Sequence, residues 1–211
     1  MSDLYPFLHG RRADRVQLAA TLVESVLAKA GESVAVKRAF FEANAAKLVE
    51  VAAALAEVYR RGGRLFTMGN GGSSCDAAHI AVEFLHPVTT GRPALAAVNL
   101  AADPAMMSAV GNDVGFAHVF VRPLVAQARR GDALIGVSTS GNSENLLAAF
   151  AKAKELGMLT IGLAGGSGGR MAASRDLDHC LVAPSDSIHR VQECHLAIYH
   201  ILWDMTHSLL A

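Results

Sequence analysis

The sequence predicts an α/β fold in which a five-stranded, doubly wound parallel sheet lies between helices. Five short apolar runs typical of buried strands alternate with helical segments from Gly62 onward. This alternation is characteristic of right-handed βαβ units, which build a parallel sheet with helices on both faces. The segment before Gly62 has apolar residues at three- and four-residue spacing, so we expect it to be helical.

The expected elements can be assigned in chain order. Residues 1–61 are expected to form the N-terminal helices, which span residues 17–30 and 34–61 and stop at Gly62 and Gly63. The expected strands are 64–68, 94–100, 133–138, 159–164 and 179–183. The expected helices between and after them are 76–85, 105–110, 118–129, 144–156 and 188–210. No repeat or linker interrupts the pattern. We therefore expect one domain over residues 1–211, with residues 62–211 forming the α/β core and the C-terminal helix.

Composition narrows the class of protein. Hydrophobic residues make up 52% of the chain and charged residues 18%, and the mean hydropathy is +0.29. A buried interface between subunits would explain this apolar content. The 19 basic and 19 acidic residues cancel, so no excess of Lys and Arg indicates a nucleic-acid partner.

The cysteines and the apolar runs indicate the compartment. Cys75, Cys180 and Cys194 form neither a CxxC motif nor an even framework, which favours a reducing compartment. The first 15 residues lack the apolar core of a signal peptide. No apolar run approaches the roughly 18 residues that a membrane span needs. We therefore expect a cytoplasmic protein without a membrane partner.

A glycine-rich loop, GNGGSSCDAAH, follows the first strand at residues 69–79. Its glycines allow a positive φ or a close approach of the backbone to a ligand. Ser73 suits either a helix N-cap or a ligand hydroxyl, and the free N–H groups of a helix start attract anions. The alternative is an ordinary tight turn, for which one glycine usually suffices. Neither GxGxxG nor GK[ST] is present, so this is not a dinucleotide fingerprint or a P-loop.

The loop after the third strand is STSGNSEN, residues 138–145. It offers four hydroxyl groups, those of Ser138, Thr139, Ser140 and Ser143, beside the N–H groups of the next helix. Neutral donors at a helix start can hold a phosphate without a lysine. The alternative is a capping cluster with Ser143 as N-cap and Glu144 in the first turn. A cap needs one hydroxyl, so the surplus favours phosphate.

Candidate acid–base and metal-binding residues lie on two helices. His79 and Glu83 are four residues apart, which places both on one helix face. They suit a metal or acid–base chemistry, although the spacing alone favours a surface ion pair. Gln192 and His200 are eight apart on the last helix, about 80° around the axis and roughly 12 Å along it. They can face a shared cleft, though not one small ion without a long reach.

A further polar stretch, GNDVGF, looks like a turn between apolar helices. Its Asn112 and Asp113 suit either a sugar contact or a cap.

Together, GNGGS, His79 with Glu83, GND, STSGNS and VQECH with His200 resemble the sugar isomerase (SIS) family over residues 34–210. Within that family the series is similar to the phosphoheptose isomerases. The resemblance implies an SIS-type fold and a homotetramer with sites at subunit interfaces. It also implies interconversion of sedoheptulose 7-phosphate and D-glycero-D-manno-heptose 7-phosphate through an enediol, which supplies heptose for bacterial lipopolysaccharide and related surface polysaccharides.

The resemblance also implies roles for single residues. Glu83 would be the base and His200 its acid/base partner, and a bound Zn²⁺ would polarise the carbonyl. Its ligands would be His79, Glu83, Gln192 and His200. Substrate contacts would come from the loops and helix ends: Asn70, Gly71, Gly72, Ser73, Glu83, Asn112, Asp113, Ser138, Thr139, Ser140, Ser143 and Gln192.

Two positions depart from the family pattern, and they leave alternatives open. Pro87 stands where an arginine is common, about four residues after the glutamate, with His86 unusual beside it. His189 stands where Asp, Thr or Ala is common. Isomerisation of another sugar phosphate is therefore one alternative. A non-catalytic regulator of the DiaA type, which binds the replication initiator, is another. Such regulators tend to lack the catalytic Glu and the late His, whereas Glu83 and His200 are present here.

Overall fold

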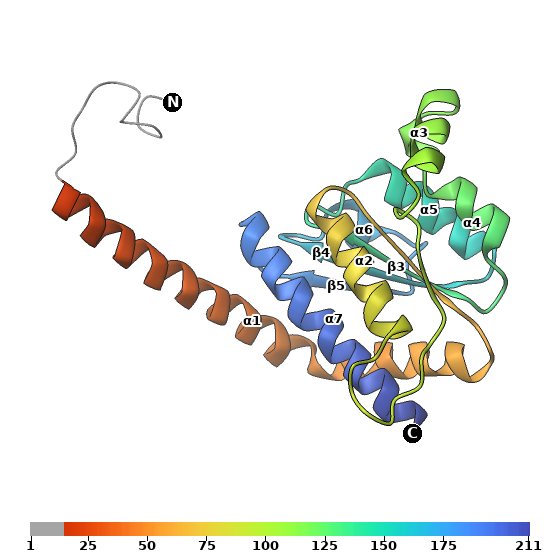
Figure 1. Cartoon of the computed structure of the whole chain (residues 1–211), viewed down its shortest axis with the longest axis horizontal. Coiled ribbons are helices and arrows are strands. Elements are labelled where there is room, and N and C mark those ends of the chain that lie inside the picture. Colours follow the sequence, from red (N-terminus) through yellow and green to blue (C-terminus); the bar gives the residue numbers. More distant parts are fainter. Residues whose placement is uncertain (1–14) are drawn as a thin grey trace. The chain divides into compact units, whose positions relative to one another are not determined.

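The structure is a computed structural model that describes residues 15–211 (Figure 1). The expected lack of a signal peptide concerns residues that lie mostly outside this range. The chain separates into two compact units, Met1–Ala35 and Val36–Ala211. In the first unit the described residues are helical. The second unit holds the sheet. The expectation of one domain over the whole chain stays a prediction.

Helices and strands follow one another largely as the alternation predicts. In chain order they are α1 (Arg15–Arg60), β1 (Leu65–Gly69), α2 (Gly72–Leu85), β2 (Ala97–Asn99), α3 (Pro104–Asp113), η2 (Phe116–His118), α4 (Val121–Gln127), β3 (Ala133–Ser138), α5 (Glu144–Glu155), β4 (Leu159–Gly165), α6 (Gly169–Ala173), β5 (His179–Ala183) and α7 (Ile188–Leu210).

The five strands form one parallel sheet in the order β2-β1-β3-β4-β5, as the α/β pattern predicts. Leu65 of β1 pairs with Ala97 of β2 on one side and with Ala133 of β3 on the other. The chain thus moves from β1 to one edge, then returns to the other side of β1 and continues outward. In sheets of this kind the ligand-binding crevice lies at the carboxyl ends of the two strands where the winding direction changes, which here are β1 and β3.

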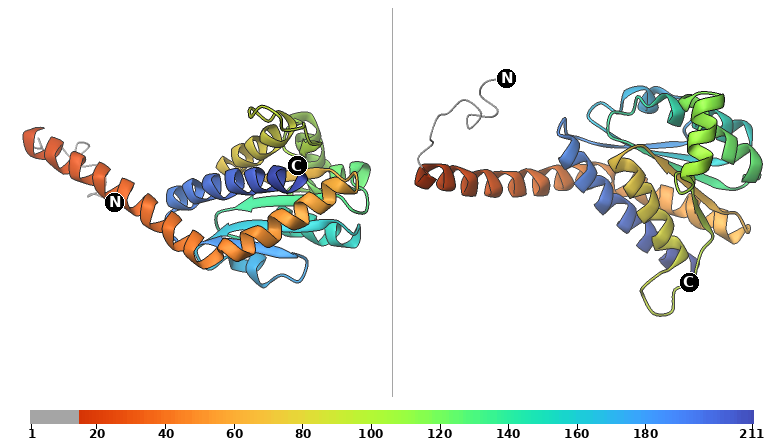
Figure 2. Two further views of the ribbon diagram at one scale, coloured as in Figure 1. Left: turned by 90° about the horizontal axis from the view of Figure 1, so that it is seen from below. Right: turned by 45° about the horizontal axis from the view of Figure 1, so that its top comes forward.

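Two apolar clusters cover the two faces of the sheet, and helices lie on both of these faces (Figure 2). α2, α7 and the part of α1 from Phe40 onward pack on one face, and α3 to α6 pack on the other. Neighbouring strand residues alternate between the clusters, as Leu65 and Phe66 do. Both faces are therefore buried, which explains why the strands read as continuous apolar runs.

The prediction of two helices before Gly62 is wrong, because α1 continues through Gly31. Gly31 has no positive φ, and a Cβ at this position would meet nothing within 4 Å. A helical glycine costs about 1 kcal/mol relative to alanine. That cost weakens a helix of this length without ending it.

Several other boundaries differ. α2 begins four residues earlier than predicted because Gly71, with φ of 54°, lets the helix start at Gly72. Asn112 and Asp113 are helical rather than in a turn, since α3 continues until Gly115 turns to φ of 98°. The helix expected at 118–129 is divided into η2 and α4, and the short α6 was not predicted.

Candidate active site

The loops after β1 and β3 meet at the crevice where the strand order reverses. The side chains of Asn70 and Asn145 join them by two reciprocal amide hydrogen bonds of 2.9 Å each. Asn145 is buried in the first turn of α5. This pair fixes the glycine-rich loop against the hydroxyl-rich loop.

The glycines after β1 have structural reasons. Gly71 needs its positive φ to begin α2. A Cβ on Gly72 would lie 2.3 Å from Nε2 of Gln192, so Gly72 lets α7 approach the start of α2. Ser73 is buried in the first turn, and the N-cap is Gly71, so of the two roles left open for Ser73 the N-cap is wrong.

The STSGNS loop holds its hydroxyl groups in a compact arrangement. Oγ of Ser138 lies 3.1 Å from Oγ of Ser143, and the amide of Gly141 donates to Ser138 Oγ. Ser143 is the N-cap of α5 but makes no side-chain capping bond. The capping alternative is therefore wrong for its side chain. Next to the loop is a cleft of about 280 Å³, lined by Thr139, Ser140, Gly165, Gly166, Ser167, Ser185, Asp186, Ile188 and Val191.

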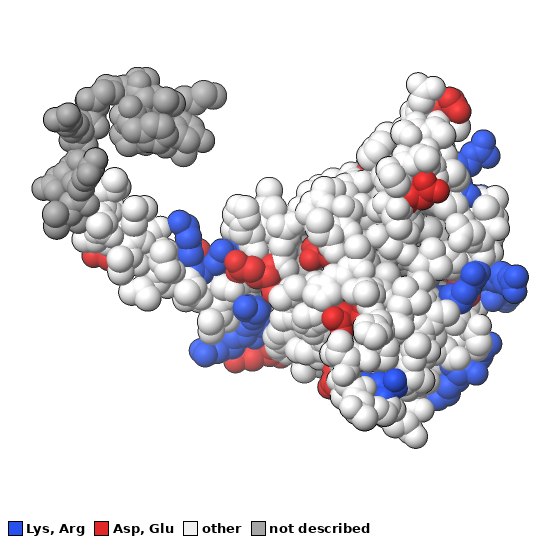
Figure 3. Space-filling view, viewed as in Figure 1, with Lys and Arg blue, Asp and Glu red and all other residues white. Residues whose placement is uncertain are grey.

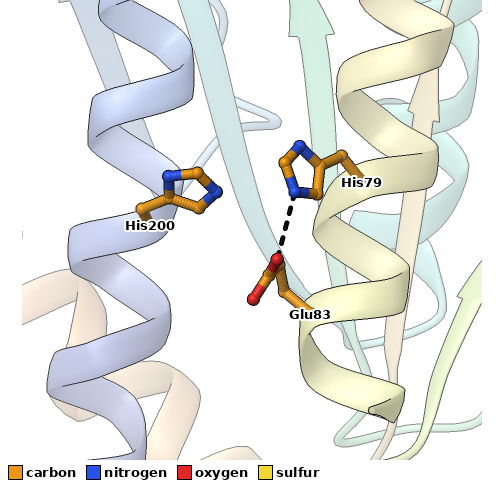
Figure 4. A group of neighbouring side chains, drawn as sticks. All are labelled: His79, Glu83 and His200. Carbon is orange, nitrogen blue, oxygen red and sulfur yellow. Dashed lines mark hydrogen bonds and ion pairs between the residues drawn. The ribbon is translucent and has the colours of Figure 1, made fainter. Parts of the chain in front are cut away.

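A cluster of three side chains lies between α2 and α7 (Figure 4). His79 and Glu83 point from α2 toward His200 on α7, and one ligand atom of each lies within 4.8 Å of the others. Nε2 of His79 is 3.0 Å from Oε1 of Glu83. The i, i+4 pair therefore faces a second helix while remaining partly exposed to solvent.

The other predicted site residues lie elsewhere. The amide group of Gln192 packs against Gly72, near the start of α2. Asn112 and Asp113 are exposed and share a hydrogen bond of 2.8 Å. They end α3, which packs on the sheet face opposite α2 and α7. Within one chain they do not join the cluster, and their contact with a sugar stays a prediction.

Burial shapes the electrostatics of the cluster. The pKa of His200 is lowered, first by burial and then by the neighbouring His79, while Glu83 acts in the opposite sense. This favours the neutral imidazole, which is the form that binds metals and accepts protons.

Three residues near the cluster were missed by sequence reasoning. Nδ1 of His79 lies 2.9 Å from the Tyr199 hydroxyl, and Asp76 is the third residue of this group. Burial raises the pKa of both Asp76 and Tyr199. Trp203 donates Nε1–H to the backbone oxygen of Glu83 at 2.8 Å. The sequence could have indicated Asp76, because it lies three residues before His79 and therefore on the same face of the helix.

The donor set fits a divalent metal ion. Two imidazoles and one carboxylate are a set that Zn²⁺ takes in catalytic sites. Tyr199 occupies the far nitrogen of His79, as a partner in the second shell of a metal site usually does. Nε2 of His79 is thereby directed toward Glu83, and both would be available to hold a cation.

A sequence model of the SIS domain matches residues 30–165. The chain belongs to the SIS domain family. Of curated proteins, it is 42% identical over 185 residues to phosphoheptose isomerase from Desulfovibrio desulfuricans, covering 87% of both chains. It is 40% identical to the phosphoheptose isomerase of Chlorobium phaeovibrioides, covering 95% of both.

A solved structure agrees with this assignment. Phosphoheptose isomerase GmhA from Neisseria gonorrhoeae superimposes with a TM-score of 0.82 at 36% sequence identity. The match covers 89% of this SIS domain protein and 99% of that chain. The likeness to the family predicted from the motifs is confirmed.

Proposed function

We propose that the protein is a phosphoheptose isomerase that converts sedoheptulose 7-phosphate to D-glycero-D-manno-heptose 7-phosphate. The single observation that carries the proposal is the convergence of His79, Glu83 and His200 from two helices. The relatives named phosphoheptose isomerase support the reaction. Glu83 and His200 are the groups that a non-catalytic member tends to lack, so they argue against a purely regulatory role.

The phosphate is assigned to the STSGNS loop. Ser138, Thr139, Ser140 and Ser143 present hydroxyl groups next to the start of α5, and the cleft beside them is open. N–H groups and the helix dipole favour an anion there. Contacts to the sugar are assigned to Asn70, Gly71, Gly72, Ser73, Glu83, Asn112, Asp113 and Gln192.

The chemistry is a proton transfer between neighbouring carbons. The Glu83 carboxylate takes a proton from C1 while His200 gives a proton to the C2 oxygen, which forms the enediol. Glu83 then returns the proton to C2 as His200 accepts the proton of the C1 hydroxyl, which leaves the C1 aldehyde. His200 must carry a proton before the first step; burial and His79 lower its pKa and oppose this, whereas the neighbouring Glu83 favours the charge.

A divalent cation, which we propose is zinc, would be held by His79, Glu83, Gln192 and His200. Bound there, it supplies a Lewis acid for the sugar carbonyl. The triad supports three of these ligands directly. The amide of Gln192 lies against Gly72, and Gln192 is roughly 12 Å along α7 from His200, so it would have to move toward the other three to join them.

The assembly is proposed to be a homotetramer with sites at subunit interfaces. Exposed apolar side chains on α2 and α7 support an interface, and they include Val82, Leu85, Leu196, Ile201 and Leu209. Uncharged side chains make up most of the face over these two helices (Figure 3). The first unit has its own exposed apolar side chains, at Leu18, Leu22, Val23, Val26 and Leu27.

Other partners and the location follow the sequence. Among residues 15–211, no helix combines the length and apolar character required to cross a membrane. The absence of a nucleic-acid partner and the cytoplasmic location stay predictions. The free cysteines Cys75, Cys180 and Cys194 are compatible with a reducing compartment.

The test is turnover of sedoheptulose 7-phosphate by purified protein, followed by NMR of the aldose C1 proton, with and without added zinc. We expect aldose to form, and Glu83→Gln to abolish turnover while the variant still binds substrate in calorimetry. Tyr59→Phe, which removes a hydroxyl that contacts the carbonyl oxygen of Ala96, is the control that keeps activity. Turnover of a different ketose phosphate alone would support the alternative substrate, and no turnover of any would refute the proposal.

A further inference from the structure

The last turn of α2 carries Glu83, and its backbone carbonyl lacks the usual helical partner. In an α-helix the carbonyl of one residue accepts from the amide four residues later. For Glu83 that residue is Pro87, which has no N–H. A carbonyl removed from water needs another donor.

Each carbonyl of this turn finds a different partner. Val82 accepts from the amide of His86, which ends the helix, and Phe84 accepts from the amide of Leu95 at 2.8 Å. Glu83 accepts from Nε1–H of Trp203 at 2.8 Å. The indole group therefore replaces the amide that Pro87 cannot provide.

The indole is itself fixed from the loop before β2 and from α7. The guanidinium group of Arg92 lies 4.5 Å from the centre of the Trp203 ring and pairs with Asp204. The ring of His207 lies 4.9 Å from it on the next turn of α7. Trp203 is only 9% exposed, so the donor has little freedom to turn away.

The hydrogen bond connects the two halves of the cluster. Trp203 is three residues after His200, which is close to one turn of α7. One bond thus ties the turn that carries Glu83 to the turn that carries His200.

We infer that Trp203 is a positioning residue that takes the place of the missing Pro87 amide and sets the separation of Glu83 and His200. This inference rests on the proposed isomerase function, in which these two residues exchange protons with substrate. The unusual proline then has a structural consequence. The Glu83 carbonyl at the end of α2 is hydrogen-bonded by a side chain of α7 instead of by a backbone amide of its own helix.

The test begins with Trp203→Phe, which keeps an aromatic ring and removes the N–H. A net hydrogen bond of about 1 kcal/mol corresponds to roughly fivefold to tenfold in rate. We expect kcat to fall by about that factor with KM unchanged. Amide hydrogen exchange in the last turn of α2 should quicken, whether or not substrate is present.

Rescue separates positioning from general damage. In the double variant Trp203→Phe/Pro87→Ala, residue 87 regains a backbone N–H that can donate a hydrogen bond to the Glu83 carbonyl. We therefore expect kcat to recover and amide hydrogen exchange in the last turn of α2 to become slow again. Pro87→Ala alone should leave both unchanged, as should Tyr59→Phe, which removes a hydroxyl that reaches only Ala96 at 3.4 Å. Arg92→Met removes the guanidinium group that holds the indole, so it should lower kcat by a smaller factor. This variant replaces Trp203→Phe in the test if Trp203→Phe does not fold.

The outcomes are distinct. Wild-type kcat and exchange in both Trp203→Phe and Arg92→Met would overturn the inference, as would a double variant that shows no recovery. An inactive wild-type protein would refute the proposed function instead, and the exchange measurements would still report whether Trp203 holds the turn.

Discussion

His195 makes the stability of the protein sensitive to acid. Its side chain is fully buried on α7, with Nε2 2.9 Å from the carbonyl oxygen of Ala164. Nδ1 is buried and has no hydrogen-bond partner among the described residues. Burial lowers the pKa of His195 from 6.5 to about 4, against a smaller opposite effect of the Ala164 bond.

The sign follows from proton binding. Between pH 6.5 and 4 the unfolded chain binds a proton at this residue and the folded protein does not, so the free energy of unfolding falls as pH falls. Above pH 6.5 both states are neutral and the effect vanishes. At about 1.4 kcal/mol per pKa unit, the loss between pH 7.5 and pH 5 is about 2 kcal/mol.

The assay is urea unfolding at pH 7.5 and pH 5, followed by fluorescence of Trp203, which is the single tryptophan. His195→Gln keeps an N–H donor for Ala164 and cannot titrate. We expect it to lose about 2 kcal/mol less than wild type on acidification. His118→Gln, at an exposed position, is the control and should match wild type. An equal loss in His195→Gln and wild type would refute the reasoning.

Two further changes test the site. Ser143→Ala removes a hydroxyl that makes no helix cap, so the free energy of unfolding should stay within about 0.5 kcal/mol. Its KM should rise about tenfold or more with kcat kept, because a hydrogen bond to a charged group is lost; an unchanged KM would place the phosphate elsewhere. Tyr199→Phe removes the partner of His79 Nδ1, so zinc affinity measured against a chromophoric chelator should fall about 10- to 100-fold. Equal affinity in wild type and variant would show that the hydroxyl does not orient the ligand.

The sequence predicted the sheet because each strand is a buried apolar run between helical segments, and this pattern depends on local residues alone. β3 and β5 have the predicted bounds. The predicted break in the N-terminal helix was wrong because one glycine, Gly31, does not end a long helix. The predicted start of α2 was wrong because Gly71 and Gly72 act through backbone geometry and the approach of Gln192, which the residue pattern does not show.

The site was predictable only in part. His79 and Glu83 share a helix, so their spacing was visible. That they face His200 depends on how α2 packs against α7, which spacing does not encode. Tyr199 and Trp203 looked like core residues, since both bury a ring, and their polar atoms reach His79 and Glu83 only in the folded chain. Trp203 also explains why Pro87 is tolerated after the turn that carries Glu83.

The distance along α2 argues for sites shared between subunits. Gly72 lies at the crevice and Glu83 is eleven residues further on, about 16 Å along the helix. A phosphate bound at the STSGNS loop and carbons reacting at Glu83 of the same chain would be about three turns apart. A site formed by two chains would remove this separation, because one would provide the phosphate loop and the other would provide Glu83 with His200.

Mixed oligomers test the shared site. Glu83→Gln and the triple variant Ser138→Ala/Ser140→Ala/Ser143→Ala should each be inactive at low substrate concentration. After unfolding and refolding together, some sites would combine an intact loop from one chain with an intact Glu83 from the other. We expect activity to return in the mixture and light scattering to give the mass of a tetramer. A mixture as inactive as its components, at the same mass, would place each site within one chain.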